Sequence, residues 1–543
     1  MTTDTRLMDR RRFLTRSGAL LAGSAWAGIA GCSDVYIPLP CMGPAAPPVP
    51  VPGMSYIRAS EIGCALDCDL FTGRNKHHGG LATDDGPRIN AAMAGASASN
   101  PITLILDGSA LISGLFLPSG GHWGIAGLGC GTGFFIQSGT NNDGIHNGGP
   151  KAAIPFDPGP PAPQRGSNVT LSNFTINGNR GNGHDGVSTT GSPQGGMNTQ
   201  AGAWYCAINL MSLDNIQITN VVVVDAPSYH MRLSNVGHVD ISGCILRSEG
   251  PNTDGFHFDG PSNDVSISNC EITSGDDAIA LNCPEGYTGD ISRVSVSNCQ
   301  VNSGSFLMRL HSVDDATGKK GRIDTVSVSG CSGSCTYAGF LVGHGVTAGP
   351  RSIDNVTILS CNLSAPAFLE IGANFGSVVL ENNLLTPSAS HLFPGFALAR
   401  SSGYSNGCSY AGGSLEIRNC SVNRNNSLQV PALSLANRST LGNLQFDGFS
   451  LADPGGHAKT TELIAIVSGT LGELTLNAVD SSHIAAALSQ GGAAGVGEVG
   501  GAGVLATGWE FPDPVMADDV PYISATTGLP SIKINGVVEP YHS

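Results

Sequence analysis

Residues Asn252 to Leu281 read NTDGFHFDGPSNDVSISNCEITSGDDAIAL and carry the clearest pattern in the chain. Within them, Val265 to Cys270 alternates apolar and polar residues, as a β-strand with one buried face does. Asp254 precedes this segment, and the pair Asp276 and Asp277 follows it. Neighbouring strands of a sheet lie about 4.8 Å apart. If successive repeats stack as strands, the three carboxylates meet on adjacent strands and can serve one substrate.

The same alternating pattern recurs along most of the chain. The last six of the eight clear copies end in cysteine, and the steps between cysteines from Cys244 to Cys361 are 26, 29, 32 and 30 residues. Three short strands with their turns fill a repeat of this length, so each repeat is predicted to form one turn of a parallel β-helix. A weaker copy lies at Val378 to Asn383, and Leu444 to Phe446 and Leu474 to Leu476 are predicted to be further strands. The clear copies are Val169 to Phe174, Ile216 to Val221, Val239 to Cys244, Val265 to Cys270, Val294 to Cys299, Val326 to Cys331, Val356 to Cys361 and Leu415 to Cys420.

Composition agrees with a turn-rich all-β protein. The 543 residues include 75 glycines, and only 13% of the residues are charged. The formal net charge of −16 argues against a nucleic-acid partner and offers no basic patch for an anionic membrane. The sequence therefore predicts an all-β fold without nucleic acid as a partner.

The cysteines are predicted to pack rather than to cross-link. Six of the 15 occupy the same point of successive repeats, and cysteine buries well as a small hydrophobe. An interior ladder of free thiols is therefore expected. Local bridges between Cys64 and Cys68 or between Cys331 and Cys335 remain the alternative, and no cysteine pair has the spacing of a zinc site.

The N-terminal segment is predicted to be a targeting signal. Arg10-Arg11-Arg12 precedes a mildly apolar run and resembles a twin-arginine export signal. The run ends in Ile29-Ala30-Gly31-Cys32, which resembles a bacterial lipobox, so Cys32 is the expected lipidation site. An ordinary cleaved signal with a chance cysteine is the alternative. Both readings place the protein outside the cytoplasm, in the periplasm or on the outer membrane or cell surface.

Four regions follow from these observations. Residues 1–32 form the export signal with the lipobox, and the proline-rich residues 33–54 form a stiff tether. Residues 55–485 form the β-helix with the catalytic site, and residues 486–543 hold a Gly- and Ala-rich linker and a small C-terminal β cap. A short capping helix over Arg88 to Ala98 is expected at the N-terminal end, with Thr83 or Asp84 accepting free backbone N–H groups.

The acidic motifs resemble those of glycoside hydrolase family 28, the polygalacturonase and rhamnogalacturonase family of right-handed parallel β-helices. The resemblance rests on Asn252-Thr253-Asp254-Gly255 followed one coil later by Gly275-Asp276-Asp277, and it covers about Gly166 to Gly345. It implies that Asp254 and Asp277 hold the attacking water and that Asp276 protonates the leaving oxygen. Inverting hydrolysis places an acid and a base about 6.5 to 9.5 Å apart, with a water between them.

Two departures from the family pattern bear on the substrate. The family carries Gly-His-Gly about one coil after the aspartate pair, where this chain has Gly304-Ser305-Phe306. It carries Arg-Ile-Lys one coil further, where this chain has Leu341-Val342-Gly343. That basic pair binds the uronate carboxylate in polygalacturonases, so plain polygalacturonate is not the expected substrate.

Other side chains are candidates for binding the sugar. Counted from the last residue of the preceding repeat, Asp254 and Arg309 both lie ten positions on and His230 lies nine. Arg309 is the candidate cation. By strand alternation His257 could point into the cleft. Tyr287, in the insertion CPEGYTG, is expected to be exposed, and Asn252 of the acidic motif is a further candidate ligand.

The aspartates have other interpretations. Asx side chains often cap turns, and bunched carboxylates can bind Ca²⁺.

We expect an inverting glycoside hydrolase that acts on a polysaccharide, as a monomer, without a cofactor or a metal, and that touches a membrane only through the lipid anchor. A Ca²⁺-dependent lyase and a non-catalytic glycan-binding surface protein are the alternatives, because β-helices host all three.

Overall fold

The fold is described here from a computed structural model. It describes residues 53–541 apart from 130, 141, 149–157, 159–160, 181–204, 315–316, 344–351, 389–395, 398–410, 424–432, 436–438, 453–461, 467–468, 489–495, 502–503, 505–508 and 512. The predicted signal, Cys32 and nearly all of the tether therefore lie outside the described residues.

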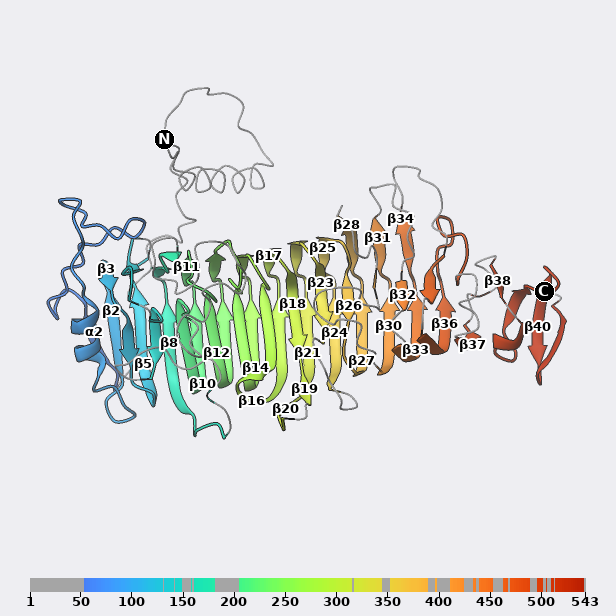
Figure 1. Cartoon of the computed structure of the whole chain (residues 1–543), viewed down its shortest axis with the longest axis horizontal. Coiled ribbons are helices and arrows are strands. Elements are labelled where there is room, and N and C mark those ends of the chain that lie inside the picture. The colour runs from blue at the N-terminus through green and yellow to red at the C-terminus, as the bar shows by residue number, and fades with distance from the viewer. Residues whose placement is uncertain are drawn as a thin grey trace, which may run out of the picture.

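The chain forms a right-handed parallel β-helix, an elongated stack of coils that begins near α2 (Gly86–Met93) and runs toward the C-terminus (Figure 1). Each coil contributes strands to parallel ladders in which every strand pairs with the strands of the coils before and after. One large apolar cluster fills the interior from Ala59 to Tyr522. The predicted fold class is confirmed.

The first ladder, called the repeat ladder, carries the sequence repeat. Val265 pairs with Val239 and Val294, and this apolar position stays in register from Val169 to Leu474, through the weak copy at Val378. The strands are β1 (Ser55–Arg58), β2 (Ile102–Leu106), β5 (Gly121–Gly127), β8 (Gly166–Ser172), the later parts of β10 (Ile208–Thr219), β12 (Met231–Ser242), β14 (Phe256–Ser268) and β16 (Ile279–Ser297), then β21 (Ile323–Ser329), β24 (Ile353–Leu359), β27 (Phe375–Glu381), β30 (Ala411–Arg418), β33 (Ser439–Asp447), β36 (Gly469–Asn477) and β37 (Val496–Gly500).

The second ladder, called the site ladder, carries the acidic motifs. It uses the first parts of the four long strands β10, β12, β14 and β16. Around them lie β4 (Leu115–Leu117), β7 (Ile145–Asn147), β18 (Phe306–His311), β23 (Ala338–Val342) and β26 (Leu369–Ile371), and a separate ladder holds β29 (Phe396–Ala397), β32 (Leu433–Leu435) and β35 (Ile464–Ile466).

The third ladder follows the repeat ladder in each coil, after a turn that has a left-handed residue. Asn269 and Asn298 have φ of 54° and 52°, and Gly330 takes the same place with φ of 63°. Asparagine and glycine tolerate this region better than other residues. The strands are β3 (Ser109–Ile112), β6 (Gly133–Ile136), β9 (Thr175–Asn177), β11 (Val222–Val224), β13 (Ile245–Arg247), β15 (Glu271–Ser274), β17 (Gln300–Ser303), β22 (Ser332–Cys335), β25 (Asn362–Ala365), β28 (Leu384–Pro387), β31 (Ser421–Asn423) and β34 (Ser450–Ala452).

The cysteine ladder lies at this turn. All six repeat cysteines are buried and free, and so are Cys64, Cys68 and Cys335, so the alternative of local bridges is wrong for those pairs. Asn383 takes the place of a cysteine in its coil. Its amide donates to the Ile358 carbonyl at 2.8 Å and accepts from the Cys361 N–H at 2.8 Å, which satisfies a polar side chain in an apolar stack.

The ends of the stack differ in detail from the sequence prediction. α2 ends at Met93, five residues before the expected end. Its N-cap is Asp85 rather than Thr83 or Asp84, and Asp85 makes no side-chain capping bond, although Asp84 accepts a hydrogen bond from the Gly86 N–H at 2.9 Å. β37 pairs with β36, so the repeat ladder continues past residue 485. Beyond it come η4 (Asp513–Val515), β38 (Glu510–Phe511), β39 (Pro521–Ser524), β40 (Pro530–Ile534) and β41 (Val537–Pro540), and a hairpin of β19 (Val313–Asp314) and β20 (Lys320–Gly321) projects from the middle coils.

Within the described part of the chain, no helix combines the length and the apolar character needed to cross a bilayer.

Candidate active site

Three aspartates lie just before two adjacent strands of the site ladder. The Gly255 N–H donates to the Asp277 carbonyl at 2.9 Å, so Asp254 and Asp277 occupy the same position in consecutive coils. Asp276 precedes Asp277 by one residue. The prediction that the three carboxylates meet on adjacent strands is met by the geometry.

Glycines of the two motifs make this stacking possible. A Cβ at Gly255 would lie 2.4 Å from the Ala278 carbonyl oxygen, and one at Gly275 would lie 2.0 Å from the Gly250 carbonyl oxygen. Any larger residue would force the coils apart at the aspartates. The glycine in each acidic motif is therefore needed to bring the backbones of neighbouring coils together.

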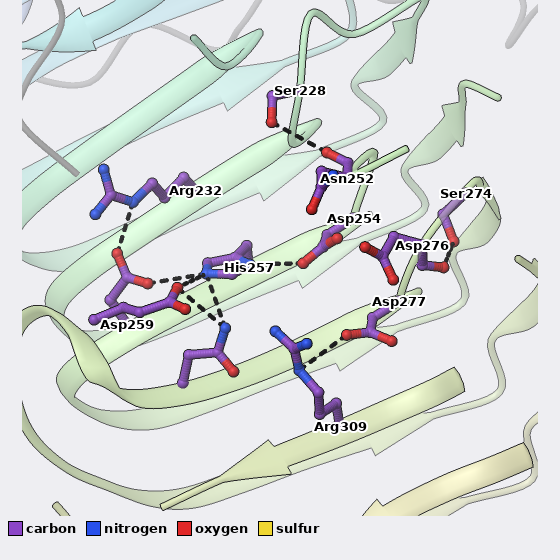
Figure 2. Close-up of polar contacts among 12 residues, drawn as sticks. Ser228, Arg232, Asn252, Asp254, His257, Asp259, Ser274, Asp276, Asp277 and Arg309 are labelled. Carbon is purple, nitrogen blue, oxygen red and sulfur yellow. Dashed lines mark hydrogen bonds and ion pairs between the residues drawn. The ribbon is translucent and has the colours of Figure 1, made fainter. Parts of the chain in front are cut away.

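The carboxylates form one tight cluster (Figure 2). One oxygen from each of Asp254, Asp276 and Asp277 lies within 4.8 Å of the others. Asp254 and Asp277 are buried, whereas Asp276 is partly exposed. Like charges this close cannot all remain ionised without compensation.

The cluster holds its protons unequally. Burial raises the pKa of Asp276 well above its usual range, and the charges of Asp277 and Asp254 raise it further. Burial also raises the pKa of Asp277, to about 6, although the Arg309 guanidinium opposes the shift. The environment of Asp276 thus favours its protonated form, as a general acid requires.

Arg309 is the cation of the cluster. Its Nε lies 3.0 Å from Asp277 Oδ2, and only 13% of its side chain is exposed. Burial alone would lower the pKa of Arg309, but the charges of Asp277, Asp254 and Asp276 raise it above its ordinary value. Arg309 therefore stays protonated beside the carboxylates.

His257 lies on the other side of Asp254. Its Nδ1 is 2.7 Å from Asp254 Oδ2, and its Nε2 is 2.8 Å from Glu285 Oε2 and 3.0 Å from Asp259 Oδ1. The ring is fully buried and stacks on Tyr229, with ring centroids 3.9 Å apart. His257 points to the acidic cluster, as alternation predicted, but its ring is covered by protein.

The register of Arg309 and His230 corrects the count made on the sequence. Arg309 is level with Ala280 and His257 rather than with Asp254, and His230 is level with Gly255. Phe256 follows Cys244 by 12 residues, whereas its counterpart Met308 follows Cys299 by 9. Three additional residues before Phe256 therefore shift the count, although Arg309 still reaches Asp277.

The remaining candidate ligands lie at the edge of this site. His230 is buried, and its Nδ1 donates to the Asp254 carbonyl at 2.8 Å; burial lowers the pKa of His230 to about 4. Asn252 is partly exposed, and its carbonyl accepts a hydrogen bond from Ser228 at 3.1 Å. Tyr287 is partly exposed within β16.

Sequence reasoning missed three charged residues that surround His257. Glu285 comes from the insertion that holds Tyr287. The other two residues, Asp259 and Arg232, form an ion pair in which Asp259 Oδ2 lies 2.6 Å from Arg232 Nε, and both side chains are fully buried. Neither Arg232 nor Asp259 belongs to a motif with known chemistry. The signal that could have found them is a charged residue at a strand position where the pattern predicts a buried one. Such residues stand out in a chain with only 13% charged residues.

Sequence reasoning also missed a copy of the acidic motif. Asn141 to His146 reads NNDGIH, and Asn252 to His257 reads NTDGFH. Asp143 and His146 lie on the same rows of the site ladder as Asp254 and His257, three coils earlier. The copy has no aspartate pair in the following coil, where Tyr205 and Cys206 stand.

Two groups of side chains have the composition of a cation site. They are Asp254, Asp276 and Asp277, and His257, Asp259 and Glu285. Each already contains a protein cation at contact distance, Arg309 for the first and Arg232 for the second. A metal ion would have to displace or repel these guanidinium groups, so the residues fit a metal poorly.

Residues 166–307 match the model of glycosyl hydrolases family 28. A probable polygalacturonase of Arabidopsis thaliana is 32% identical over 97 residues, which cover 16% of this chain and 21% of that protein. The chain thus spans about a fifth of this curated relative.

Solved structures give lower identities over longer stretches. The family 28 exopolygalacturonase of Yersinia enterocolitica is 12% identical, with coverage of 78% of this chain and 75% of that chain and a TM-score of 0.48. The surface protein and adhesin PfbA of Streptococcus pneumoniae is also 12% identical, with coverage of 82% and 100% and a TM-score of 0.49.

The fold and the cluster define a right-handed parallel β-helix with a carboxylate centre on its outer face. All three aspartates lie within the residues matched by the family model, and Arg309 lies two residues beyond them. Over residues 166–307 the chain is similar to glycosyl hydrolases family 28.

Proposed function

We propose that this protein is an exported glycoside hydrolase that cleaves a polysaccharide with inversion, using Asp254, Asp276 and Asp277. The observation that carries the proposal is the unequal environment of three carboxylates within 4.8 Å of one another. Asp276 lacks an ion-pair partner among the described residues, and its pKa is raised well above the usual range by burial and then by Asp277 and Asp254. Asp277 is paired with Arg309, and Asp254 with His257.

This environment assigns the roles. Asp276 gives its proton to the glycosidic oxygen as the bond from that oxygen to the anomeric carbon breaks. A water attacks the anomeric carbon from the opposite face, and Asp254 accepts a proton from it. Asp277 holds the water together with Asp254. The products are two sugar chains, one with a new reducing end, and the acid and base have exchanged one proton.

The spacing of the carboxylates makes the stereochemistry a sharp test. Inverting pairs usually lie about 6.5 to 9.5 Å apart and retaining pairs about 5 to 5.5 Å apart. The oxygens here approach within 4.8 Å, which is closer than expected for inversion. Inversion is proposed from the family resemblance and from Asp254 Oδ1, a buried oxygen that has no hydrogen-bond partner in the described part of the chain. Proton NMR of the first product distinguishes the two anomers.

We propose further that the sugar beside Arg309 carries no carboxylate. Leu341 is the residue level with Arg309 in the next coil, and it packs with Phe306, Ala338 and Ala367 in an apolar cluster outside the main core. Arg309 itself is neutralised by Asp277. A uronate at this position would meet the carboxylates of the cluster, and the residue level with Arg309 in the next coil is apolar and offers it no charge, whereas a neutral sugar would bring no like charge to the cluster.

The lyase alternative requires a base that can lose its proton. The nearest candidate is Arg309, and the carboxylates around it raise its pKa, which makes it a poor base. The residues also fit Ca²⁺ poorly, as described above. The geometry thus favours hydrolysis over β-elimination.

Product analysis on a panel of neutral and acidic polysaccharides tests the proposal. Asp276→Asn should abolish turnover and keep glycan binding, because only the proton donor is lost. The matched control is Asp240→Asn, the same exchange at an exposed position of β12. Unsaturated products would establish a lyase, and binding without products from the wild type would establish a glycan receptor.

The proposal extends to the location of the protein. Export by the twin-arginine route and lipidation of Cys32 rest on the N-terminal motifs alone. The periplasm, the outer membrane or the cell surface would give the enzyme access to polysaccharides.

A further inference from the structure

His257 is a buried ring with a carboxylate at each nitrogen. Nδ1 faces Asp254 at 2.7 Å, and Nε2 faces Glu285 at 2.8 Å and Asp259 at 3.0 Å. A neutral imidazole has one nitrogen with a lone pair, which a carboxylate would repel. Asn282 Nδ2, 3.2 Å from Nε2, could donate to such a lone pair. Two carboxylate oxygens at shorter distances outweigh this one neutral donor, so both ring nitrogens carry a proton.

The groups around the ring hold it in place. Tyr229 stacks on one face at an angle of 9° between the planes. Arg232 pairs with Asp259 at 2.6 Å, and the Asn282 amide donates to Glu285 at 3.1 Å. The ring cannot rotate without breaking its contacts with three carboxylates. Since it is also fully buried, it acts on a substrate only through Asp254.

The motif copy three coils earlier provides an internal comparison. His146 follows Asp143 by three residues, as His257 follows Asp254, but neither ring nitrogen of His146 has a hydrogen-bond partner among the residues that the structure describes. Asp143 instead accepts from the Cys206 N–H at 2.7 Å and the Asn209 amide at 2.9 Å. Burial lowers the pKa of His146 to about 4. The spacing of aspartate and histidine alone therefore does not make the contact seen at Asp254.

What differs at His257 is the second pair of carboxylates. Burial alone would lower the pKa of His257, but the hydrogen bond to Asp254, the close Asp259 carboxylate and the hydrogen bond to Glu285 raise it well above its usual range. The bond from His257 in turn lowers the pKa of Glu285 to about 2 against the effect of burial. Glu285 and Asp259 thus keep the charge on the ring, and the ring presents that charge to Asp254.

We propose that His257, held by Glu285 and Asp259, is the positioning residue of the catalytic base Asp254. The imidazolium binds Asp254 Oδ2, which turns Oδ1 toward the attacking water. This role rests on the proposed hydrolase function. It also explains why the three carboxylates differ. Asp254 and Asp277 each contact a cation, so Asp276 is the carboxylate that holds the proton.

The charge of the ring can be measured without any substrate. In protein labelled with ¹⁵N-histidine, the signals lost in His257→Gln identify the ring. We expect both of its nitrogens to be protonated and unchanged between pH 6.5 and 8.5, while His146 is neutral in the same spectra. A ring of His257 that is neutral at pH 7.5 would overturn the proposal.

Kinetics on the cleaved glycan test the role. His257→Gln keeps an amide donor but loses the charge, and we expect kcat to fall about 100-fold, as for a misplaced catalytic group, with KM changed less than about 3-fold. In an Asp254→Asn background the same exchange should cause little further loss, because it acts through Asp254. Glu285→Gln should have a smaller effect, since Asp259 still faces Nε2. His238→Gln, at an exposed ring of β12, is the control.

The outcomes separate this proposal from the proposed function. Normal kcat in His257→Gln, or a full additional loss in the Asp254→Asn background, would exclude positioning while hydrolysis stands. A wild type that hydrolyses none of the glycans would refute the function and the role together, even with a doubly protonated ring. If His257→Gln fails to fold, the kinetics of Glu285→Gln still decide, and a normal kcat in that variant would exclude the role.

Discussion

Replacement of Arg309 by methionine should destabilise the protein in a way that depends on pH. The Arg309 Nε lies 3.0 Å from Asp277 Oδ2, and at an effective dielectric constant of about 20 the attraction of two unit charges at this distance is about 5.5 kcal/mol. Breaking a buried pair by removing one partner costs about 3 to 5 kcal/mol, since the other charge is left buried. We expect a loss of this size in the free energy of unfolding at pH 8.

The sign of the pH dependence follows from Asp277. Burial raises its pKa to about 6 in the folded protein, above its value in the unfolded chain, although Arg309 lowers it. The folded state therefore binds the additional proton, and stability rises as the pH falls. In the wild type Asp277 contributes about 0.4 kcal/mol between pH 8 and pH 6. Without Arg309 its pKa rises further, and the gain approaches about 1.4 kcal/mol for each unit of pH.

The measurement is urea unfolding of both proteins at pH 8 and pH 6. The difference between wild type and Arg309→Met should shrink by about 2 kcal/mol over this range. Arg293→Met is the control, because Arg293 pairs with Asp264 at an exposed site and its hydrogen bond holds the pKa of Asp264 below the usual range, so the effect should be the same at both pH values. A difference below about 1 kcal/mol at pH 8, or one equal at both pH values, would refute the reasoning.

Other predictions concern metal, thiols and the lipid anchor. EDTA should leave hydrolysis intact, because Arg309 already neutralises the cluster; activity restored only by Ca²⁺ would contradict this. An aromatic disulfide reagent should not react with the ladder thiols, such as Cys299 and Cys331, until the protein is unfolded in denaturant, since these side chains are buried; rapid reaction in the native state would show that the ladder opens. Cys32→Ala should move the protein from the membrane fraction to the soluble fraction, and a wild type that is already soluble would exclude the lipobox.

The fold was predictable because each coil repeats one physical requirement. An inward apolar residue at Val265 needs partners at Val239 and Val294, and the sequence shows all three with the same neighbours. The acidic motifs were predictable for the same reason, since a residue's place in its coil fixes its place on the molecule. Even the weak copy at Val378 keeps this register.

What escaped prediction depends on contacts across coils of unequal length. The coil of Phe256 has three additional residues before this strand. Counting along the sequence therefore placed Arg309 level with Asp254, whereas it is level with His257 in the structure. Glu285 lies in an insertion, and nothing in its local sequence says that it turns back to His257. Alternation placed His257 on the outer face, but it could not reveal that Tyr229 and Glu285 cover the ring.

The stacking of coils also determines how the site responds to damage. Each coil of a solenoid is supported by its two neighbours, so such proteins fray from their ends when they begin to unfold. The side chains from Asp254 to Arg309 come from consecutive coils in the middle of the stack (Figure 1). Partial melting of either end should shorten the folded rod before it reaches the carboxylates, and catalysis should therefore outlast the first loss of β-structure on heating.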